Sequence, residues 1–169
     1  MRPWLARRLL FKRMTPTVPT DKIDARILRV LQEEGRISNL QLAERVHLSP
    51  TAVAGRVKRL KREGYILGYR ARLNPLKLGL GLAAFVEVQL DRVAADAMRR
   101  FTSAVQQRPE IIECHLIAGS FDYLLKLRVA DTHAQRDGVA ALVRSLPGVR
   151  ELRTHTVTQQ LKHGHACAV

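Results

Sequence analysis

The residues best suited to binding chemistry are cations that follow a run of small side chains in the front half of the chain. Residues 49–55 are SPTAVAG, and residues 56–62 are RVKRLKR. Small and hydroxyl side chains allow close approach to base edges, whereas lysine and arginine bind phosphates. We predict base contacts from Ser49, Thr51, Ala52, Gly55 and Arg56, and phosphate contacts from Lys58, Arg59, Arg62 and Arg70. The alternative is a pair of helices whose charges are merely solvated.

Two short helices and a tight turn would position these side chains. Ser38 and Gln41 have capping-box spacing at the start of a helix over residues 40–46. Ser49 and Pro50 are typical of the N-cap and first position of a second helix, over residues 50–63, which Gly64 would end. The predicted inward side chains are Leu40, Ala43 and Val46 in the first helix and Val53, Val57 and Leu60 in the second. This pattern predicts a helix-turn-helix.

The flanking segments complete a domain of the winged type. A preceding helix over residues 21–34 has an apolar face at helical spacing, formed by Ile23, Ile27, Val30 and Leu31. Residues 65–73 are rich in β-formers around Gly68 and predict a short hairpin or wing. Asn74-Pro75 then breaks the chain and marks the predicted domain junction.

The rear half shows the same pattern twice, a strand, a helix and a strand. The predicted strands are 83–90, 111–118, 123–129 and 149–159, and the helices are 95–108 and one that Thr132 caps. The predicted inward side chains are Met98, Phe101 and Val105 in the first helix, Ile112, Cys114, Leu116 and Ala118 in the second strand, Tyr123, Leu125, Leu127 and Val129 in the third strand, and Val139, Leu142, Val143 and Leu146 in the second helix. The order βαββαβ predicts a ferredoxin-like sandwich, and the whole chain an α+β protein.

Two helices cover only one face of such a sheet. The other face would present Phe85, Glu87, Ile117 and Leu124, and we expect a second subunit to cover it. A two-fold homodimer would also supply the paired helices that palindromic DNA requires.

The charge distribution supports a polyanion partner for the front half. The net charge is +14, and residues 1–75 contribute +11 of it. We predict a disordered basic arm at 1–20, a DNA-binding domain at 21–73, a linker at 74–82, a second domain at 83–162 and a tail at 163–169. Two cysteines without CxxC spacing and the lack of an apolar run of about 18 residues indicate a cytoplasmic protein that does not enter membranes.

Enzyme and metal signals are weak. Gly79, Gly81 and Ala84 imitate a dinucleotide fingerprint, but they precede a predicted strand and open no helix. Cys114 and His115 are adjacent in a strand and so point to opposite faces. The tail residues His163, His165 and Cys167 have ligand types but no predicted scaffold. We therefore predict no catalytic residues, no metal and no cofactor.

The strings GRISNLQLAERVHLSPT, RVKRLKREGYILGY, ECHLIAGSFDYLLKLRV and LPGV occur in this order between residues 35 and 149. They resemble the leucine-responsive regulatory protein/asparagine-regulator (Lrp/AsnC) family of prokaryotic transcription factors. The resemblance implies a DNA-binding regulator that responds to an amino acid such as leucine and assembles from dimers into octamers on the nucleoid. The alternative is an architectural, nucleoid-compacting protein without an effector. A stand-alone sensor or small enzyme built on the rear half also stays open.

The resemblance also implies an effector-response region. Its residues would be Gly119, Ser120, Phe121, Asp122, Tyr123, Thr132, His155 and Thr156. Asp122 could accept from the effector's ammonium group, and backbone N–H groups at 119–121 could hold its carboxylate. The alternative for this loop is a β-turn in which Asp122 makes an Asx bond. The sequence departs from the family pattern at His47, where glycine is usual, and at Ser120, where an acidic residue is usual.

Overall fold

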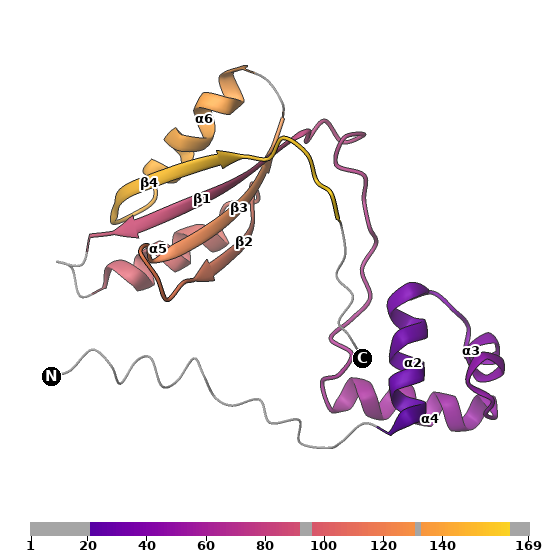
Figure 1. The fold of residues 1–169 in the computed structure, drawn as a ribbon. Coiled ribbons are helices and arrows are strands. Elements are labelled where there is room, and N and C mark those ends of the chain that lie inside the picture. Colours follow the sequence, from indigo (N-terminus) through magenta and orange to yellow (C-terminus); the bar gives the residue numbers. More distant parts are fainter. Residues whose placement is uncertain (1–20, 92–95, 131–132, 163–169) are drawn as a thin grey trace, which may run out of the picture. The chain divides into compact units, whose positions relative to one another are not determined.

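The computed structural model describes residues 21–91, 96–130 and 133–162 (Figure 1). The described chain divides into two compact units between residues 71 and 72. The predicted arm, Thr132 and the tail that holds His163, His165 and Cys167 lie outside the described residues. Within these ranges, no helix is both long and apolar enough to span a membrane.

The described part of the front unit contains three helices with well-formed caps, α2 (Lys22–Glu33), α3 (Asn39–Val46) and α4 (Pro50–Arg62). The Ser38 hydroxyl accepts from the backbone N–H of Gln41, whose side chain bonds back to the N–H of Ser38, so the predicted capping box is present. Ser49 Oγ accepts from the N–H of Ala52 at 3.2 Å and caps α4. The predicted helix-turn-helix is thus confirmed, with boundaries within one residue of those expected at most ends.

The core of the front unit contains one residue that the pattern misplaced. Its buried apolar side chains are Ile27, Leu42, Ala43, Val46, Val53 and Leu60, with Ile23, Val30, Leu31 and Val57 packed around them. Leu40, predicted to point inward, is exposed, and Leu42 takes its place. On α3, the observed set of Leu42, Ala43 and Val46 spans a narrower arc than the predicted set, which had Leu40 in place of Leu42. The observed three side chains can therefore face the core together.

The predicted wing does not form a hairpin. The structure has no strand between residues 65 and 73. The N–H groups of Tyr65 and Ile66 both donate to the carbonyl of Leu60, so the chain folds back against the end of α4. Beyond them Leu67 is almost fully exposed and has no strand beside it. A two-stranded ribbon without a sheet or helix to cover it is only marginally stable, which explains the difference.

The turn between α3 and α4 contains a strained residue. His47 has φ 57° and ψ 50°, the left-handed conformation in which glycine is usual. That conformation costs an L-residue about 1–2 kcal/mol, whereas glycine adopts it freely but loses more entropy on folding. We expect His47→Gly to raise the free energy of unfolding of the front unit by about 0.5–1 kcal/mol. Denaturant titration at constant m-value measures this change.

Gly64 supplies the matched control for that prediction. It has φ 79° directly after the C-cap of α4. Gly64→Ala should therefore destabilise the same unit by about 1 kcal/mol. A stabilising effect of Gly64→Ala, or a destabilising effect of His47→Gly, would contradict the assigned backbone conformations.

The rear unit is the predicted βαββαβ sandwich. Its elements are β1 (Leu82–Leu90), α5 (Ala97–Gln106), β2 (Ile111–Leu116), β3 (Tyr123–Val129), α6 (His133–Arg144) and β4 (Val149–Thr156). All neighbouring strands are antiparallel, in the order β2-β3-β1-β4. Side chains from both helices, Phe101 and Val105 of α5 and Val139 and Val143 of α6, share one core with the inner face of the sheet. Both helices therefore cover the same face (Figure 1).

Four predicted core positions of the rear unit are wrong, because Met98, Ile112, Leu116 and Ala118 are exposed. Strand β2 lies at the edge of the sheet and ends at Leu116, so Leu116 and Ala118 lie at and beyond its end, where no second layer of the described chain covers them. The pairing of β2 with β3 shifts register between Ile111 and Glu113, so Ile112 is an extra residue that the regular alternation does not anticipate. Ile111 packs against the core instead, and Ile112 is exposed. Met98 of α5 is 50% exposed, because Ala97 occupies the inward position of the first turn. The other predicted strand stripe, Tyr123 to Val129, is buried as expected.

The open face of the sheet is less apolar than predicted. Phe85 and Leu124 are half-buried there, but charged side chains separate them. Lys126 Nζ lies 2.7 Å from Glu113 Oε1 and 6.0 Å from the centre of the Phe85 ring. This ion pair lowers the pKa of Glu113. Subunit contact through this face would therefore involve polar side chains as well as Phe85 and Leu124.

Candidate nucleic-acid interface and ligand pocket

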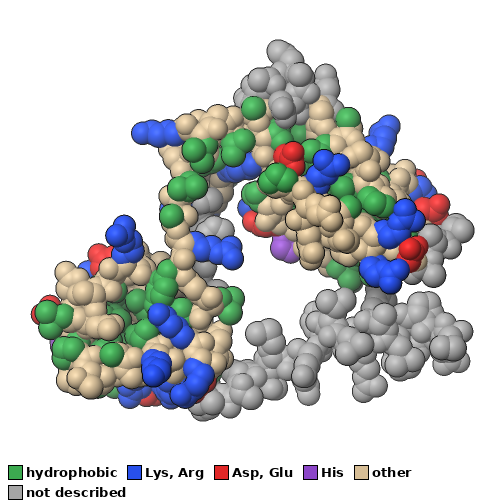
Figure 2. All heavy atoms as spheres, turned by 180° about the vertical axis from the view of Figure 1, so that it is seen from behind, with side chains coloured by type: hydrophobic (Ala, Val, Ile, Leu, Met, Phe, Trp, Pro, Cys, Tyr) green, Lys and Arg blue, Asp and Glu red, His purple; other side chains and the backbone are tan. Residues whose placement is uncertain are grey.

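Helix α4 presents one exposed face of mixed small and basic side chains. Residues at spacings of four, three and four lie on one side of a helix, and four exposed residues of α4 follow this spacing, namely Thr51, Gly55, Lys58 and Arg62. We call these four residues the outward stripe. The buried Val53 and Leu60 lie on the opposite side. Lysine and arginine side chains gather at the edge of the helical unit where α4 lies (Figure 2).

Gly55 makes the middle of the outward stripe flat. A Cβ atom added at Gly55 would meet no atom within 4 Å, so packing within the protein does not require glycine there. Glycine in a helix interior costs about 1 kcal/mol relative to alanine. Ser49 and Ala52 are exposed beside the stripe at the N-terminal end of α4, and Arg70 is exposed in the segment after the helix. Several of the predicted DNA-contacting residues thus form one continuous exposed surface, which a duplex can approach.

Arg56 and Arg59, however, point toward helix α2. Arg56 Nη1 lies 2.6 Å from Asp21 Oδ2 and 2.8 Å from Asp24 Oδ1. Arg59 Nη2 pairs with the second oxygen of Asp24. Asp24 is only 1% exposed, while the Arg56 and Arg59 side chains are 29% and 33% exposed. We call these four residues the arginine clamp.

The arginine clamp has clear electrostatic consequences. Asp21 caps α2 by accepting from the N–H of Asp24 at 2.7 Å, and this bond together with the Arg56 guanidinium lowers the pKa of Asp21. The carboxylates of Asp21 and Asp24 raise the pKa of Arg56. In the protein without DNA, the guanidinium groups of Arg56 and Arg59, which are predicted to contact a base and a phosphate, make ion pairs to Asp21 and Asp24. Sequence spacing could not identify these ion pairs, because neither Asp21 nor Asp24 belongs to the helix-turn-helix pattern.

In the rear unit, the loop between β2 and β3 is held to strand β1. The carboxylate of Asp122 accepts from the N–H of Leu90 at 2.9 Å, and the N–H of Asp122 donates to the carbonyl of Val88 at 3.0 Å. Gln89 Nε2 donates to the carbonyl of Ser120 at 2.7 Å. The carboxylate of Asp122 thus accepts from strand β1, and its contact with an effector ammonium group stays a prediction.

The other predicted effector residues do not form one cluster. Tyr123 is buried, and its ring lies 4.8 Å from that of Phe101; burial raises the pKa of Tyr123 to about 12. His155 in strand β4 lies opposite Phe85 in strand β1, and its Nε2 atom lies 3.1 Å from Glu87 Oε1. Thr156 follows His155 in β4 and so points to the opposite face. Gly119, Ser120 and Phe121 form the loop itself, and Ser120 and Phe121 help to line a pocket.

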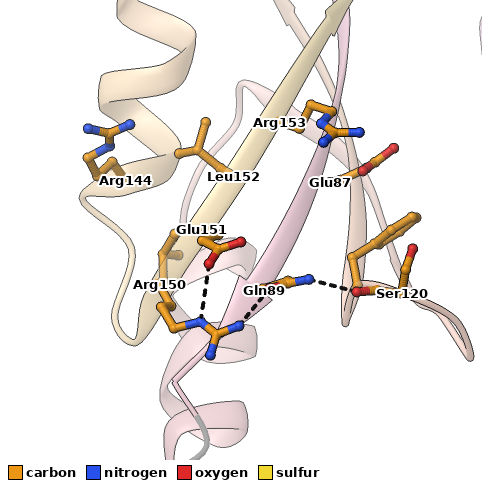
Figure 3. A pocket seen from close by; sticks show the side chains of 10 residues that line it. Glu87, Gln89, Ser120, Arg144, Arg150, Glu151, Leu152 and Arg153 are labelled. Carbon is orange, nitrogen blue, oxygen red and sulfur yellow. Dashed lines mark hydrogen bonds and ion pairs between the residues drawn. The ribbon is translucent and has the colours of Figure 1, made fainter.

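That pocket has a volume of about 630 Å³ and is polar (Figure 3). It lies between the end of β1, the 120–121 loop and strand β4, and its lining residues are Glu87, Gln89, Ser120, Phe121, Arg144, Val149, Arg150, Glu151, Leu152 and Arg153. Arg150 Nη2 donates to Gln89 Oε1 at 2.7 Å, and its Nε lies 3.8 Å from Glu151 Oε1. Guanidinium and carboxylate groups in one pocket can bind the two charged ends of an amino acid. We call it the polar pocket.

Sequence reasoning missed most of the polar pocket. Its charged residues lie at the paired ends of two strands that are about sixty residues apart in the chain, with Gln89 opposite Glu151 and Glu87 opposite Arg153. Alternation within β4 could have indicated that Glu151 and Arg153 share a face. Only the register of β4 on β1 places them beside Gln89 and Ser120.

The weak enzyme and metal signals find no support in the described part of the chain. Its residues contain no group of three or more His, Cys, Asp or Glu side chains that could hold a metal ion. Gly79 lies in a turn before strand β1, and no helix starts there. Cys114 packs against the core, where burial raises the pKa of its thiol, while His115 is exposed and lies 3.3 Å from Glu113. Nothing in this geometry resembles a nucleophile and base pair.

Comparison with known proteins matches both halves of the chain. Residues 20–66 match a model described as winged helix-turn-helix DNA-binding, and residues 83–166 match the Lrp/AsnC ligand binding domain. The chain is 47% identical over 154 residues to the leucine-responsive regulatory protein of Klebsiella pneumoniae, which covers 91% of this chain and 94% of that one. The same identity and coverage hold for the leucine-responsive regulatory protein of Escherichia coli strain K12.

Solved structures with the same fold are also found. A transcriptional regulator from Neisseria meningitidis, in complex with L-Met, has a TM-score of 0.83 and 37% identity over 89% of this chain and 97% of that one. An AsnC family regulator from Agrobacterium tumefaciens has a TM-score of 0.81 and 27% identity over 88% and 97%. These similarities extend across both units of the chain.

Proposed function

The chain belongs to the Lrp/AsnC family of DNA-binding transcription regulators, and we propose that it binds selected sites in double-stranded DNA through the outward stripe of α4 under the control of an amino acid such as leucine. The observation that carries the proposal is the flat, exposed and basic face of Thr51, Gly55, Lys58 and Arg62, opposite the buried face of the same helix. A helix of this kind fits the major groove, with its N-terminal residues toward the bases.

Within this proposal the residues have separate roles. Ser49, Thr51, Ala52 and Gly55 contact base edges at the N-terminal end of α4, and Lys58, Arg62 and Arg70 bind phosphates. Arg56 and Arg59 hold α4 against α2 through the arginine clamp. The front unit, which has most of the chain's positive charge, binds the DNA, so the protein would be found on the nucleoid.

The salt dependence of binding tests the phosphate contacts. Each lost phosphate contact should reduce the slope of log K against log salt by about 0.9 for each protomer. We therefore expect Lys58→Ala to weaken binding to all duplexes alike, with this change in slope, as measured by fluorescence anisotropy. Arg99→Ala removes an exposed cation of helix α5 in the rear unit and is the control. An equal change in slope for both variants would contradict the role of Lys58.

The effector would bind in the polar pocket. Arg150 is suited to an α-carboxylate and Glu151 to an ammonium group, because both side chains line the pocket. Phe121, Val149 and Leu152 supply apolar surface for a side chain such as that of leucine. The name of the K. pneumoniae relative and the L-Met complex of the N. meningitidis regulator support an amino acid of this class.

Thermal-shift measurements with the twenty amino acids test this assignment. A ligand at a hundred times its dissociation constant should stabilise the folded chain by about 2.7 kcal/mol. We expect an apolar amino acid to produce this shift, Arg150→Ala to abolish it and Arg99→Ala to leave it unchanged. If no amino acid raises the melting temperature of the wild-type chain, the effector assignment is wrong.

Assembly through the open sheet face completes the proposal. A homodimer would bring two copies of α4 to successive turns of the duplex, and further association would give octamers. The half-buried Phe85 and Leu124 support a contact at this face. The strong positive charge also fits a second candidate, an architectural protein that compacts DNA without sequence preference. Uniform protection of random DNA would favour that candidate.

A further inference from the structure

The arginine clamp occupies two cations that lie beside the outward stripe. Arg56 follows Gly55, and Arg59 follows Lys58, so both side chains start from backbone positions adjacent to the proposed DNA-binding face. A guanidinium group binds phosphate through paired N–H donors, as it binds a carboxylate. In the free protein, donors of both groups are engaged by Asp21 and Asp24.

Stability alone is a poor explanation for this arrangement. Removing ions from water costs nearly as much as their attraction returns, and apolar side chains of similar size often serve equally well. Both arginines keep about a third of their side-chain surface exposed, so they have not been drawn into the core. The aspartate that joins them is itself almost completely buried. The clamp therefore fixes where the two cations point, which is a role separate from stability.

We propose that Asp21 and Asp24 act as internal substitutes for DNA phosphates, which hold Arg56 and Arg59 away from the duplex and thereby limit the affinity for DNA of any sequence. Asp24 is thus a positioning residue for the DNA-binding face. This inference rests on the proposed function, because it specifies how many cations of α4 reach phosphates. Fewer phosphate contacts weaken binding to random DNA and leave base contacts to decide which sites are occupied.

The test is the salt dependence of binding to a random-sequence duplex, measured on the full chain. Asp24→Asn keeps the shape of the side chain but removes the charge that both arginines share. Asp24→Asn removes the carboxylate that holds Arg59, whereas Arg56 keeps its contact with Asp21, so we expect the slope of log K against log salt to become steeper by about 0.9 for each protomer. The double variant Asp21→Asn with Asp24→Asn removes both carboxylates from Arg56 as well and should steepen the slope by about 1.8. Preference for a selected duplex over a random one should fall in both variants.

Two controls separate this effect from general changes of charge or fold. Glu33→Gln removes one exposed negative charge from the same helix α2 and should leave the slope unchanged. Adding Arg56→Gln and Arg59→Gln to Asp24→Asn should return the slope to or below that of the wild type. Arg59→Gln leaves Asp24 paired with Arg56, so it tests the inference even if Asp24→Asn does not fold, and the slope of Arg59→Gln should equal that of the wild type because Arg59 makes no phosphate contact in the wild type.

The outcomes are distinguishable. A wild-type chain that shows no salt-dependent binding to duplex DNA overturns the proposed function and this inference together. Wild-type binding with an unchanged slope in folded Asp24→Asn, or with a shallower slope in Arg59→Gln, overturns the inference alone. A slope that also steepens in Glu33→Gln overturns it as well, because the effect would then arise from net charge.

Discussion

Gly55→Leu is expected to lower the affinity for a selected DNA site by about 10³-fold, the lower end of the range that separates specific from non-specific binding. Gly55 lies in the middle of the outward stripe, where a leucine side chain would project into the space that the bases occupy. Affinity for random DNA should change little, because Lys58 and Arg62 remain available to phosphates. Anisotropy titrations of a selected and a random duplex measure the two effects.

The same substitution should not damage the protein itself. No atom lies within 4 Å of a Cβ added at Gly55, and leucine favours helix more than glycine does by roughly 0.5–1 kcal/mol. Gly138 in helix α6 also has no atom within 4 Å of an added Cβ. Gly138→Ala should therefore stabilise the rear unit by about 1 kcal/mol without affecting DNA binding. Undiminished selective binding by Gly55→Leu would show that this face of α4 does not meet the bases.

Phe101→Ala is expected to destabilise the rear unit by about 3–5 kcal/mol, which is the usual cost of removing a buried phenylalanine. Phe101 is fully buried between helix α5 and the sheet, and its ring packs against that of Tyr123. The melting temperature of the rear unit should fall by roughly 15 °C or more. Since the front unit has a separate core, its own transition should stay in place.

Met98→Ala is the control for this prediction. Met98 lies on the same helix but is half-exposed, so its truncation should change stability by about 0.5 kcal/mol or less. Calorimetry resolves the two transitions. A common shift of both transitions in Phe101→Ala would contradict the division of the chain into two independent cores.

Structural features that depend on side chains close together in the chain were predicted correctly from the sequence. Ser38 with Gln41 and Ser49 with Pro50 indicate where α3 and α4 begin, because capping uses side chains that are adjacent in the chain. The alternation from Tyr123 to Val129 predicted strand β3 to the residue. Apolar periodicity and element order were enough to predict the ferredoxin-like sandwich, since few topologies accommodate βαββαβ.

Features that depend on contacts between distant segments could not be predicted. The bulge at Ile112 depends on how β2 pairs with β3, and the polar pocket depends on the register of β4 on β1. The burial of Asp24 could not be predicted, because nothing in the sequence indicates that Arg56 and Arg59 would cover it. The hairpin at residues 65–73 was predicted from composition, but composition does not supply the neighbour that a strand requires.

Chemical protection of guanine N7 is the most direct test of the central claim, that the outward stripe of α4 lies in the major groove. The DNA would be a duplex selected from a random pool by the wild-type chain, and dimethyl sulfate would report the N7 atoms, which lie in the major groove. We predict two protected patches about one helical turn apart, both lost with Gly55→Leu. Major-groove N7 atoms that stay reactive throughout the bound site, or a pool from which no sequence is enriched, would contradict the account.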